Sequence, residues 1–270
     1  MKHRITRGLV LGVAVLSWKM SGHASEQMRS ADGLESGKLA VAVYGLHVKN
    51  EDLQFRLRGA DLIQVPLKGG GTAQFFADGN TDLRFQGKSE AALVRFTWRP
   101  ATGFYYTFKA GVGDYRLEIP SGTAVNVLEN GSQGRLWGVD AGWTLVSDTP
   151  VNPAVALSLG YARSDYNLER LQSGSSAPVA VNQRFTLEEE QIALSVSHRW
   201  KRLEPYGGLK IFRQAGSLYD KNAADRVQGR RDGWSPYAGL RIEFFPREAL
   251  VLEAFGADER GAALGVSLGF

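Results

Sequence analysis

Residues 260–270 read RGAALGVSLGF, and this stretch decides the fold. Apolar side chains occupy every second position, and glycine, alanine or serine occupies the positions between them. The apolar positions are Ala262, Leu264, Val266, Leu268 and Phe270. Alternation with a period of two places successive side chains on opposite faces of an extended strand. The stretch therefore predicts a β-strand with one apolar face and one face of small residues, followed directly by the end of the sequence at an aromatic residue.

The same alternation recurs along the chain. In residues 134–147, for example, Trp137, Val139 and Trp143 alternate with glycine, Asp140 and threonine. Strands of this kind are expected near residues 38–48, 88–99, 103–118, 134–147, 153–168, 185–201, 205–218, 233–245, 249–256 and 260–270. The pattern predicts an all-β protein of about ten strands.

The connections between these strands are alternately short and long. The short ones each contain proline and cover residues 99–103, 147–152, 201–205 and 245–248. The long ones are rich in glycine, serine, asparagine and charge, and cover residues 119–133, 171–184 and 219–232. Short turns at one end and long loops at the other are typical of membrane β-barrels.

Residues 49–87 allow two interpretations. Leu53, Phe55 and Leu57 alternate with polar residues, and the sequence Ala-Asp-Gly-Asn at 77–80 is typical of a hairpin turn. The segment is either one long outer loop that contains a β-hairpin or two further strands, which would make about twelve. Because the rising strand at 75–77 would be short, ten strands are favoured.

Together, the terminal strand that ends on Phe270, the alternating strands and the two lengths of connection resemble the small bacterial outer-membrane barrels of the opacity and OmpA transmembrane type. The resemblance implies a closed antiparallel transmembrane β-barrel over residues 38–270, with short periplasmic turns and long extracellular loops. It also implies that Leu264, Val266, Leu268 and Phe270 form the signal that the barrel-assembly machinery reads. Both chain ends of such a barrel lie in the periplasm.

The N-terminal residues have the features of a secretory signal peptide. Lys2, Arg4 and Arg7 precede a short apolar stretch, and small residues at Gly22 and Ala24 predict cleavage after Ala24. Residues 1–24 are therefore expected to be removed, and residues 25–37 to form a periplasmic tail. The predicted location is the outer membrane of a Gram-negative bacterium.

Charge excludes a nucleic-acid-binding protein. The net charge of +4 arises in residues 1–24, which contain four basic residues and no acidic ones. The remaining chain has 28 basic and 28 acidic residues and is formally neutral.

Aromatic residues near the short turns predict an interfacial girdle, the ring of aromatic side chains that borders the apolar band of a barrel. The expected members are Trp98, Phe104, Trp143, Trp200, Tyr206 and Phe244. His198 shares a strand face with Val196 and Trp200, so it is also expected to lie in this girdle.

Charged residues on the opposite strand faces are expected to project into the barrel interior. They are Arg95, Arg99, Lys109, Asp140, Glu189, Arg199, Arg241, Glu243 and Glu253. An unpaired buried charge costs several kcal/mol, so opposite charges in a narrow interior should pair. The set predicts a network of ion pairs that fills the lumen; the alternative is a charged pore for small solutes.

Candidate catalytic groups are few. The chain has no cysteine, and Ser197 and His198 are adjacent in a strand, so their side chains point to opposite faces. A pairing of His47 with Asp258 or Glu259 at the outer rim would be similar to the omptin outer-membrane proteases. No cofactor or metal site is expected.

The favoured function is therefore a non-enzymatic barrel with surface loops and a structural, adhesive or envelope-integrity role. The alternatives are a narrow channel and a barrel enzyme that hydrolyses lipid or peptide. The expected partners are outer-membrane lipid, lipopolysaccharide and the assembly machinery, and a monomer is favoured.

Overall fold

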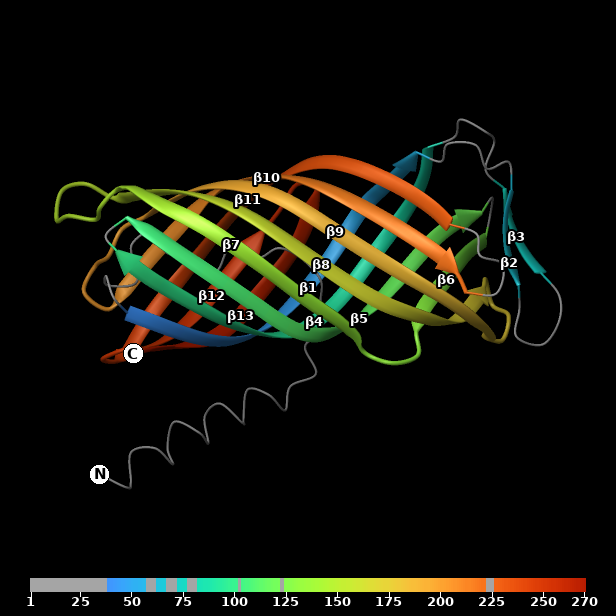
Figure 1. Cartoon of the computed structure of the whole chain (residues 1–270), viewed down its shortest axis with the longest axis horizontal. Helices are drawn as coiled ribbons and strands as arrows, with labels where there is room; N and C mark the ends of the chain where they lie inside the picture. The colour runs from blue at the N-terminus through green and yellow to red at the C-terminus, as the bar shows by residue number, and fades with distance from the viewer. Residues whose placement is uncertain are drawn as a thin grey trace, which may run out of the picture.

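The structure is a computed structural model, and it describes residues 38–56, 62–66, 72–76, 82–101, 103–121, 124–221 and 226–270. The predicted signal peptide, the predicted tail at 25–37 and the predicted turn at 77–80 lie outside these residues. The described residues form strands and their connections (Figure 1). Within these ranges, no helix is long and apolar enough to cross a membrane.

Ten strands close into an antiparallel barrel, in which each strand pairs with its neighbours in the order below and the last pairs with the first. They are β1 (Lys38–Arg56), β4 (Asp82–Ala101), β5 (Phe104–Ser121), β7 (Gly134–Val146), β8 (Ala154–Ser173), β9 (Val179–Ser197), β10 (Leu203–Asp220), β11 (Arg226–Phe245), β12 (Glu248–Phe255) and β13 (Glu259–Gly269). The predictions of an all-β fold and of ten barrel strands are confirmed.

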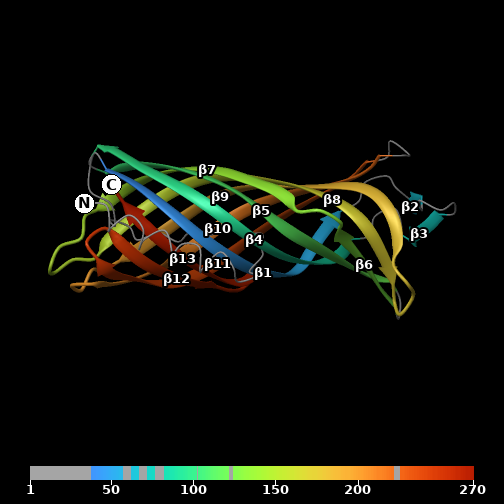
Figure 2. The same ribbon diagram turned by 90° about the horizontal axis from the view of Figure 1, so that it is seen from below.

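The seam of the barrel joins its first and last strands. Val43 on β1 lies opposite Val266 on β13, and Leu39 and Phe270 exchange backbone hydrogen bonds of 3.4 and 2.7 Å. Closure satisfies the backbone groups that an open sheet would expose to lipid. Lys38 and Phe270 therefore lie at the same end of the barrel, where the C-terminus is marked in both ribbon views (Figures 1 and 2).

Tight turns connect the strands at the end of the barrel that holds the C-terminus. Lys201 and Arg247 have positive φ angles of 58° and 76° in two of them. Gly103, in a third, has a φ of 92°, a conformation that glycine adopts without steric cost. Its carbonyl accepts a 2.6 Å hydrogen bond from the backbone of Thr144.

The opposite end is more regular than expected, because several strands continue into the predicted long loops. Residues 171–184 and 219–232 were expected to be loops, but β8 continues to Ser173, β9 begins at Val179 and β11 begins at Arg226. The predicted loop at 119–133 contains a further strand, β6 (Ala124–Asn130). It pairs with the parts of β5 and β8 that lie farther from the tight turns, whereas β7 pairs with the parts that lie nearer to them.

An apolar cluster explains these extensions. These segments have polar outer faces, and the cluster gives them a buried apolar inner face. It consists of Tyr115, Leu117, Ile119, Leu128, Tyr166, Leu168, Leu171, Val181, Phe185 and Leu187. Glycine, serine and charge in these segments suggest loops, whereas burial of every second side chain stabilises strands. We call this part of the barrel the outer collar.

The segment 49–87 adds no strand to the barrel. β1 continues to Arg56 and β4 begins at Asp82, and these two residues lie opposite each other. Between them, β2 (Leu62–Pro66) and β3 (Thr72–Phe76) form a separate hairpin beyond the end of the barrel (Figures 1 and 2). The interpretation with ten barrel strands and a separate β-hairpin is confirmed, but residues 49–56 and 82–87 continue β1 and β4 and do not form a loop.

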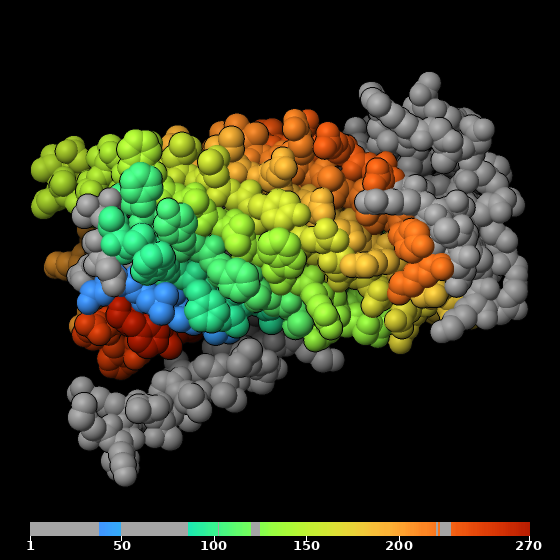
Figure 3. All heavy atoms as spheres, in the orientation of Figure 1, coloured from blue at the N-terminus to red at the C-terminus, as the bar shows by residue number. Residues whose placement is uncertain are grey.

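The outer wall carries a band of exposed apolar side chains. On β9, for example, Ile192, Leu194 and Val196 are exposed, whereas the residues between them are buried. In the space-filling view, side chains of neighbouring strands form a continuous wall (Figure 3). An apolar outer face and a polar inner face are the arrangement of a transmembrane barrel.

Candidate functional site: the polar interior

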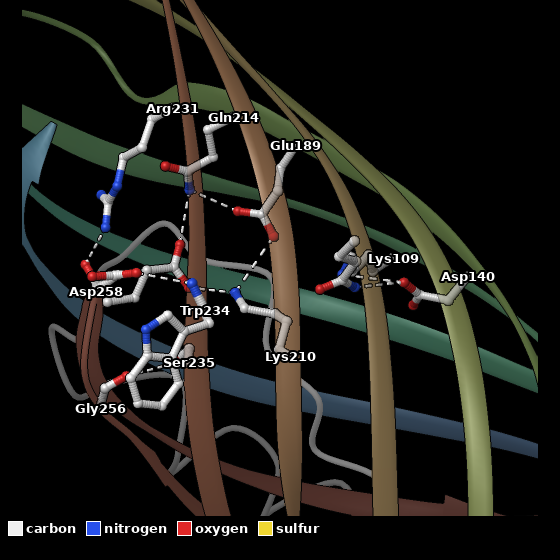
Figure 4. A network of polar contacts seen from close by, with 12 residues as sticks. Lys109, Asp140, Glu189, Lys210, Gln214, Arg231, Trp234, Ser235, Gly256 and Asp258 are labelled. Atoms are coloured by element: carbon white, nitrogen blue, oxygen red, sulfur yellow. Dashed lines mark hydrogen bonds and ion pairs between the residues drawn. The ribbon is translucent and has the colours of Figure 1, made fainter. Parts of the chain in front are cut away.

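A cluster of charged and amide side chains crosses the middle of the barrel (Figure 4). Lys210 on β10 forms ion pairs with Glu189 on β9, at 3.4 Å, and with Glu259 at the start of β13. Gln214 donates hydrogen bonds to Glu189, at 2.7 Å, and to Glu259, at 2.8 Å. All four side chains are buried, and Glu259 has no exposed surface. The cluster links strands that lie on different sides of the lumen.

Short polar contacts fasten the turn between β12 and β13 to β11 (Figure 4). Arg231 donates a 2.6 Å hydrogen bond to the carbonyl of Asp258, and the Asp258 carboxylate accepts a 2.9 Å bond from the Trp234 backbone N–H. Ser235 donates to the carbonyl of Gly256 at 2.8 Å. The turn therefore holds Glu259 in place beside Lys210.

A second charged group lies deeper in the barrel. Lys109 on β5 is 3.7 Å from Asp140 on β7 (Figure 4). Gln191 on β9 donates a 3.1 Å hydrogen bond to the same carboxylate. Amide donors of this kind satisfy the oxygen atoms of buried carboxylates, which would otherwise carry a large desolvation cost.

The end of the barrel that contains the tight turns has its own chain of ion pairs. Arg241 contacts Glu204 at 3.2 Å and Glu243 at 2.7 Å, and Glu243 also binds Arg199. Nearby, the hydroxyl of Tyr206 donates a 3.0 Å hydrogen bond to Glu253. These contacts join β10, β11, β12 and the turn that follows β9.

Much of the remaining interior surface is apolar. One cluster is formed mainly by residues of β1 and β4, and it consists of Ala42, Tyr44, Leu46, Val48, Ala91, Leu93, Leu136, Tyr206, Tyr237, Val251 and Ala263. The polar groups described above therefore share the lumen with a packed apolar wall.

Most charges that the sequence assigned to the interior are placed there. Arg99, Lys109, Glu189 and Glu253 are buried, and Asp140, Arg241 and Glu243 are largely buried. Arg95 is half-buried, with its guanidinium carbon 5.8 Å from the ring centroid of Tyr44.

The structure corrects the predicted position of Arg199. Its side chain is 51% exposed, because β9 ends at Ser197 and the strand alternation ends with it. It reaches Glu243 from the turn and does not project into the lumen.

Four predicted girdle residues, Trp98, Phe104, Trp143 and Trp200, are exposed on the outer wall. The rings of Phe104 and Trp143 are stacked, with centroids 5.8 Å apart.

Tyr206 is wrongly assigned to this girdle: it is buried and faces inward, because it shares a face of β10 with Lys210. Phe244 is half-buried, and the irregular pairing at the end of β11 exposes Phe245 instead.

On β13, Leu264, Val266 and Leu268 alternate with small residues that include the buried Ala263 and Gly265, and Phe270 follows the strand with an exposed ring.

His47 and His198 each lie close to a carboxylate. His47 faces outward and lies 3.4 Å from Glu90 on β4, whereas Glu259, its expected partner, is inside the barrel. The omptin-like rim pair is therefore wrong.

His198 lies in the turn after β9 and contacts Asp148 at 2.8 Å, so it is a paired residue as well as a neighbour of Trp200.

Lys210, Gln214, Glu204 and Glu259 are interior residues that the sequence interpretation missed. Lys210 and Gln214 lie on the face of β10 opposite the apolar Leu209 and Ile211, so alternation along residues 205–218 would have grouped them on the inner face. Glu259 is the first residue of its strand, where alternation gives little guidance.

The interior arrangement favours structural pairing over chemistry. Each carboxylate described above is held by a cation, an amide or a hydroxyl. Across the described ranges, no three His, Asp or Glu side chains are grouped so that they could hold a metal ion.

No family model and no curated protein matches the sequence. Among solved structures, the outer membrane protease OmpT from Escherichia coli is similar, at 13% identity, over 89% of this chain and 100% of that one, with a TM-score of 0.47. The translocator domain of the autotransporter NalP from Neisseria meningitidis shares 11% identity over 99% and 95%, with a TM-score of 0.46.

The outer membrane protein OprG from Pseudomonas aeruginosa is also similar, at 8% identity, over 90% of this chain and 99% of that one, with a TM-score of 0.44. The closed antiparallel barrel, the apolar outer band and the polar interior define this chain, on its own geometry, as a β-barrel of the outer-membrane type.

Proposed function

We propose that the protein is a non-enzymatic outer-membrane barrel with a closed lumen, whose outer collar and β2–β3 hairpin present a surface outside the cell. In this proposal the signal peptide is removed near Ala24. The assembly machinery recognises the last strand through Leu264, Val266, Leu268 and Phe270. The mature barrel is a monomer surrounded by lipid and lipopolysaccharide.

The observation that carries the proposal is the packing of the interior at successive levels. Near the tight turns Glu204 is buried, in the middle Lys210 and Leu46 are buried, and in the outer collar Leu168 and Phe185 are buried. Side chains just fill the interior of a barrel of about eight strands, whereas barrels of about sixteen leave an aqueous channel, and ten strands are closer to the filled size. A lumen filled in this way supports a structural or adhesive role over transport.

The two alternatives make different demands. A channel for small solutes needs a continuous path past the Lys210 cluster, and the contacts of Glu189, Gln214 and Glu259 occupy that level. A hydrolase needs a nucleophile beside a base, and His47 pairs with Glu90 on the outer wall.

A liposome-swelling assay tests the proposal. Liposomes that contain the purified, refolded protein should swell in small sugars and amino acids no faster than liposomes without protein, whereas a general porin should give rapid swelling. Solute-size-dependent swelling would favour the channel.

A further inference from the structure

The tight turn between β9 and β10 has two basic residues at its tip. Lys201 and Arg202 are its central residues, and Trp200 and Leu203 close it with backbone hydrogen bonds of 2.7 and 3.0 Å. Lys201 has a φ of 58°, at the position where a two-residue hairpin turn with one positive φ usually has glycine. A 2.8 Å hydrogen bond from the backbone of Glu243 to the Arg202 carbonyl joins this turn to the end of β11.

The next turn, between β11 and β12, has the same peculiarity. Phe245 lies opposite Glu248, and Pro246 and Arg247 are the two residues between them. Arg247 has a φ of 76°, and a positive φ at the residue after proline in such a turn favours glycine. The β4–β5 turn follows this preference, since its residue with positive φ is Gly103.

Turn geometry therefore does not account for the basic residues. A residue with a Cβ atom is strained at positive φ, whereas glycine adopts this conformation freely. Two of the three turns nevertheless have a long basic side chain at the strained position. Glycine at both positions would close the hairpins at least as well, so the cations have another role.

The three basic side chains of these turns are available to a ligand. Lys201, Arg202 and Arg247 are exposed, and none of them forms an ion pair or a side-chain hydrogen bond with a residue that the structure describes. Asp148, in the β7–β8 turn, binds His198 at 2.8 Å instead.

The acidic side chains of the two turns and of the strand ends beside them do not neutralise these cations. Glu243 binds Arg199 and Arg241, and Glu204 binds Arg241. Glu248, which is partly buried, is the remaining acidic side chain. Three cations and one carboxylate leave an excess of two positive charges.

Aromatic and apolar side chains surround the turns on the outer wall. Trp200 is 61% exposed, Phe245 is 63% exposed, and Leu203 is also exposed. Exposed aromatic rings at the end of a transmembrane strand mark the level of the lipid headgroups. Basic side chains beside them can therefore reach the headgroups while their aliphatic parts contact apolar surface.

We propose that Lys201, Arg202 and Arg247 bind the headgroup of an anionic phospholipid in the leaflet that surrounds the tight turns. The inference goes beyond the closed lumen and rests on the proposed membrane location. Lysine and arginine bind phosphate oxygens, and clustered basic residues at a membrane surface attract anionic lipid. Trp200 and Phe245 favour a lipid over free phosphate, because they would contact its chains while the cations contact its headgroup.

The test is binding of phosphatidylglycerol to the full-length mature protein in neutral detergent, measured by native mass spectrometry. Wild type is compared with Lys201→Gly/Arg247→Gly, which removes two cations and relieves the strain at both positive φ angles. The variant Lys201→Arg/Arg247→Lys keeps both charges. The control Arg163→Gln/Arg213→Gln removes two outward cations of β8 and β10 that pair with acidic residues. Heat-modifiable migration in gels establishes that each variant is folded.

We expect the glycine variant to bind phosphatidylglycerol at least fivefold more weakly, with a urea midpoint no lower than that of wild type. The charge-keeping and control variants should bind within about twofold of wild type. Phosphatidylcholine, which has no net charge, should bind wild type and the glycine variant equally. If the glycine variant does not fold, Lys201→Asn/Arg247→Asn replaces it, because asparagine also adopts positive φ.

Undiminished binding by the glycine variant, or equal affinity of wild type for the two lipids, would overturn the proposal. A lower urea midpoint of the glycine variant would assign the cations to the stability of the turns and also overturn it. Displacement by equimolar inorganic phosphate would overturn the assignment to a lipid. Liposome swelling tests the closed lumen independently of these results.

Discussion

Lys210 on β10 and Glu259 on β13 form a buried ion pair that crosses the interior of the barrel. Gln214 and Glu189 complete the cluster, so each charge has a partner. Removing only one partner of a buried ion pair lowers the stability of the fold strongly, because the other charge remains in an interior that solvates it poorly. This relationship is the basis of the first prediction.

Lys210→Met should lower the free energy of unfolding by about 3–5 kcal/mol, because it leaves Glu189 and Glu259 buried without their cation. Lys210→Met combined with Glu259→Gln should recover part of the loss. The measurement is urea unfolding of the refolded barrel, followed by tryptophan fluorescence. Arg213→Gln, on the same strand as Lys210, breaks the exposed pair with Asp232 of β11; it is the control and should leave the urea midpoint nearly unchanged. Equal costs for the two single variants would contradict the assignment of the cluster to a dry interior.

Gly208 allows Tyr237 to cross β10 and donate a 3.2 Å hydrogen bond to the carbonyl of Leu194 on β9. A Cβ atom at Gly208 would collide with both the Tyr237 hydroxyl and this carbonyl. Gly208→Ala should therefore destabilise the barrel by about 1–3 kcal/mol, the usual cost of overpacking. Gly256→Ala, where a Cβ would meet open space, should unfold at nearly the wild-type urea concentration. A tolerated Gly208→Ala would show that the interior is looser than described.

Asp165 should make the outer collar sensitive to acid. It lies beyond Tyr161, outside the apolar band of β8. Burial raises the pKa of its carboxyl, but hydrogen bonds from Arg163, Arg184 and Thr186 outweigh this effect, and the pKa lies below its ordinary value. A carboxyl with a lowered pKa stabilises the fold above its unfolded-state pKa, and this stabilisation is lost as the pH falls through the folded-state pKa.

Asp165→Asn should therefore be less stable than wild type at pH 7, and the difference should shrink as the pH falls below about 4, near the ordinary pKa of aspartate. Urea midpoints at several pH values measure this. Asp232→Asn, in an exposed pair, serves as the control and should differ little from wild type at any pH. A stability difference that is constant from pH 7 to pH 2 would contradict the role of the ionised carboxylate.

The topology predicts which epitope tags are accessible. A tag inserted after Ser175, in the connection between β8 and β9, should be labelled on intact cells, since this connection lies at the end of the barrel opposite the tight turns. A tag at Ala101, beside the β4–β5 turn, should be labelled only after permeabilisation. Labelling of both tags on intact cells would reverse or break the proposed orientation.

Period-two alternation was sufficient to predict the ten barrel strands and the orientation of most side chains. In 134–147 the assigned faces agree with the burial of the strand. Alternation was not sufficient at strand ends, because side chains cease to alternate between the two faces where strand pairing ends. Arg199 follows the end of β9 and Phe244 lies at an irregular pairing, so both were misplaced.

The outer collar was harder to predict for a different reason. Its strands contain many glycine, serine and charged residues, and their stability depends on Tyr166, Phe185 and the rest of the apolar cluster coming together from distant segments. The partners of Lys210 could not be predicted from the sequence either, because strand register decides which carboxylate lies across the lumen from it.

Single-channel recording in planar bilayers tests the closed lumen most directly. The purified wild-type barrel, inserted and confirmed to be folded, should give no stable open conductance in 1 M KCl, because the Lys210 cluster and the collar residues fill the interior. A reproducible, long-lived open state in the wild-type protein would contradict the account and favour the channel.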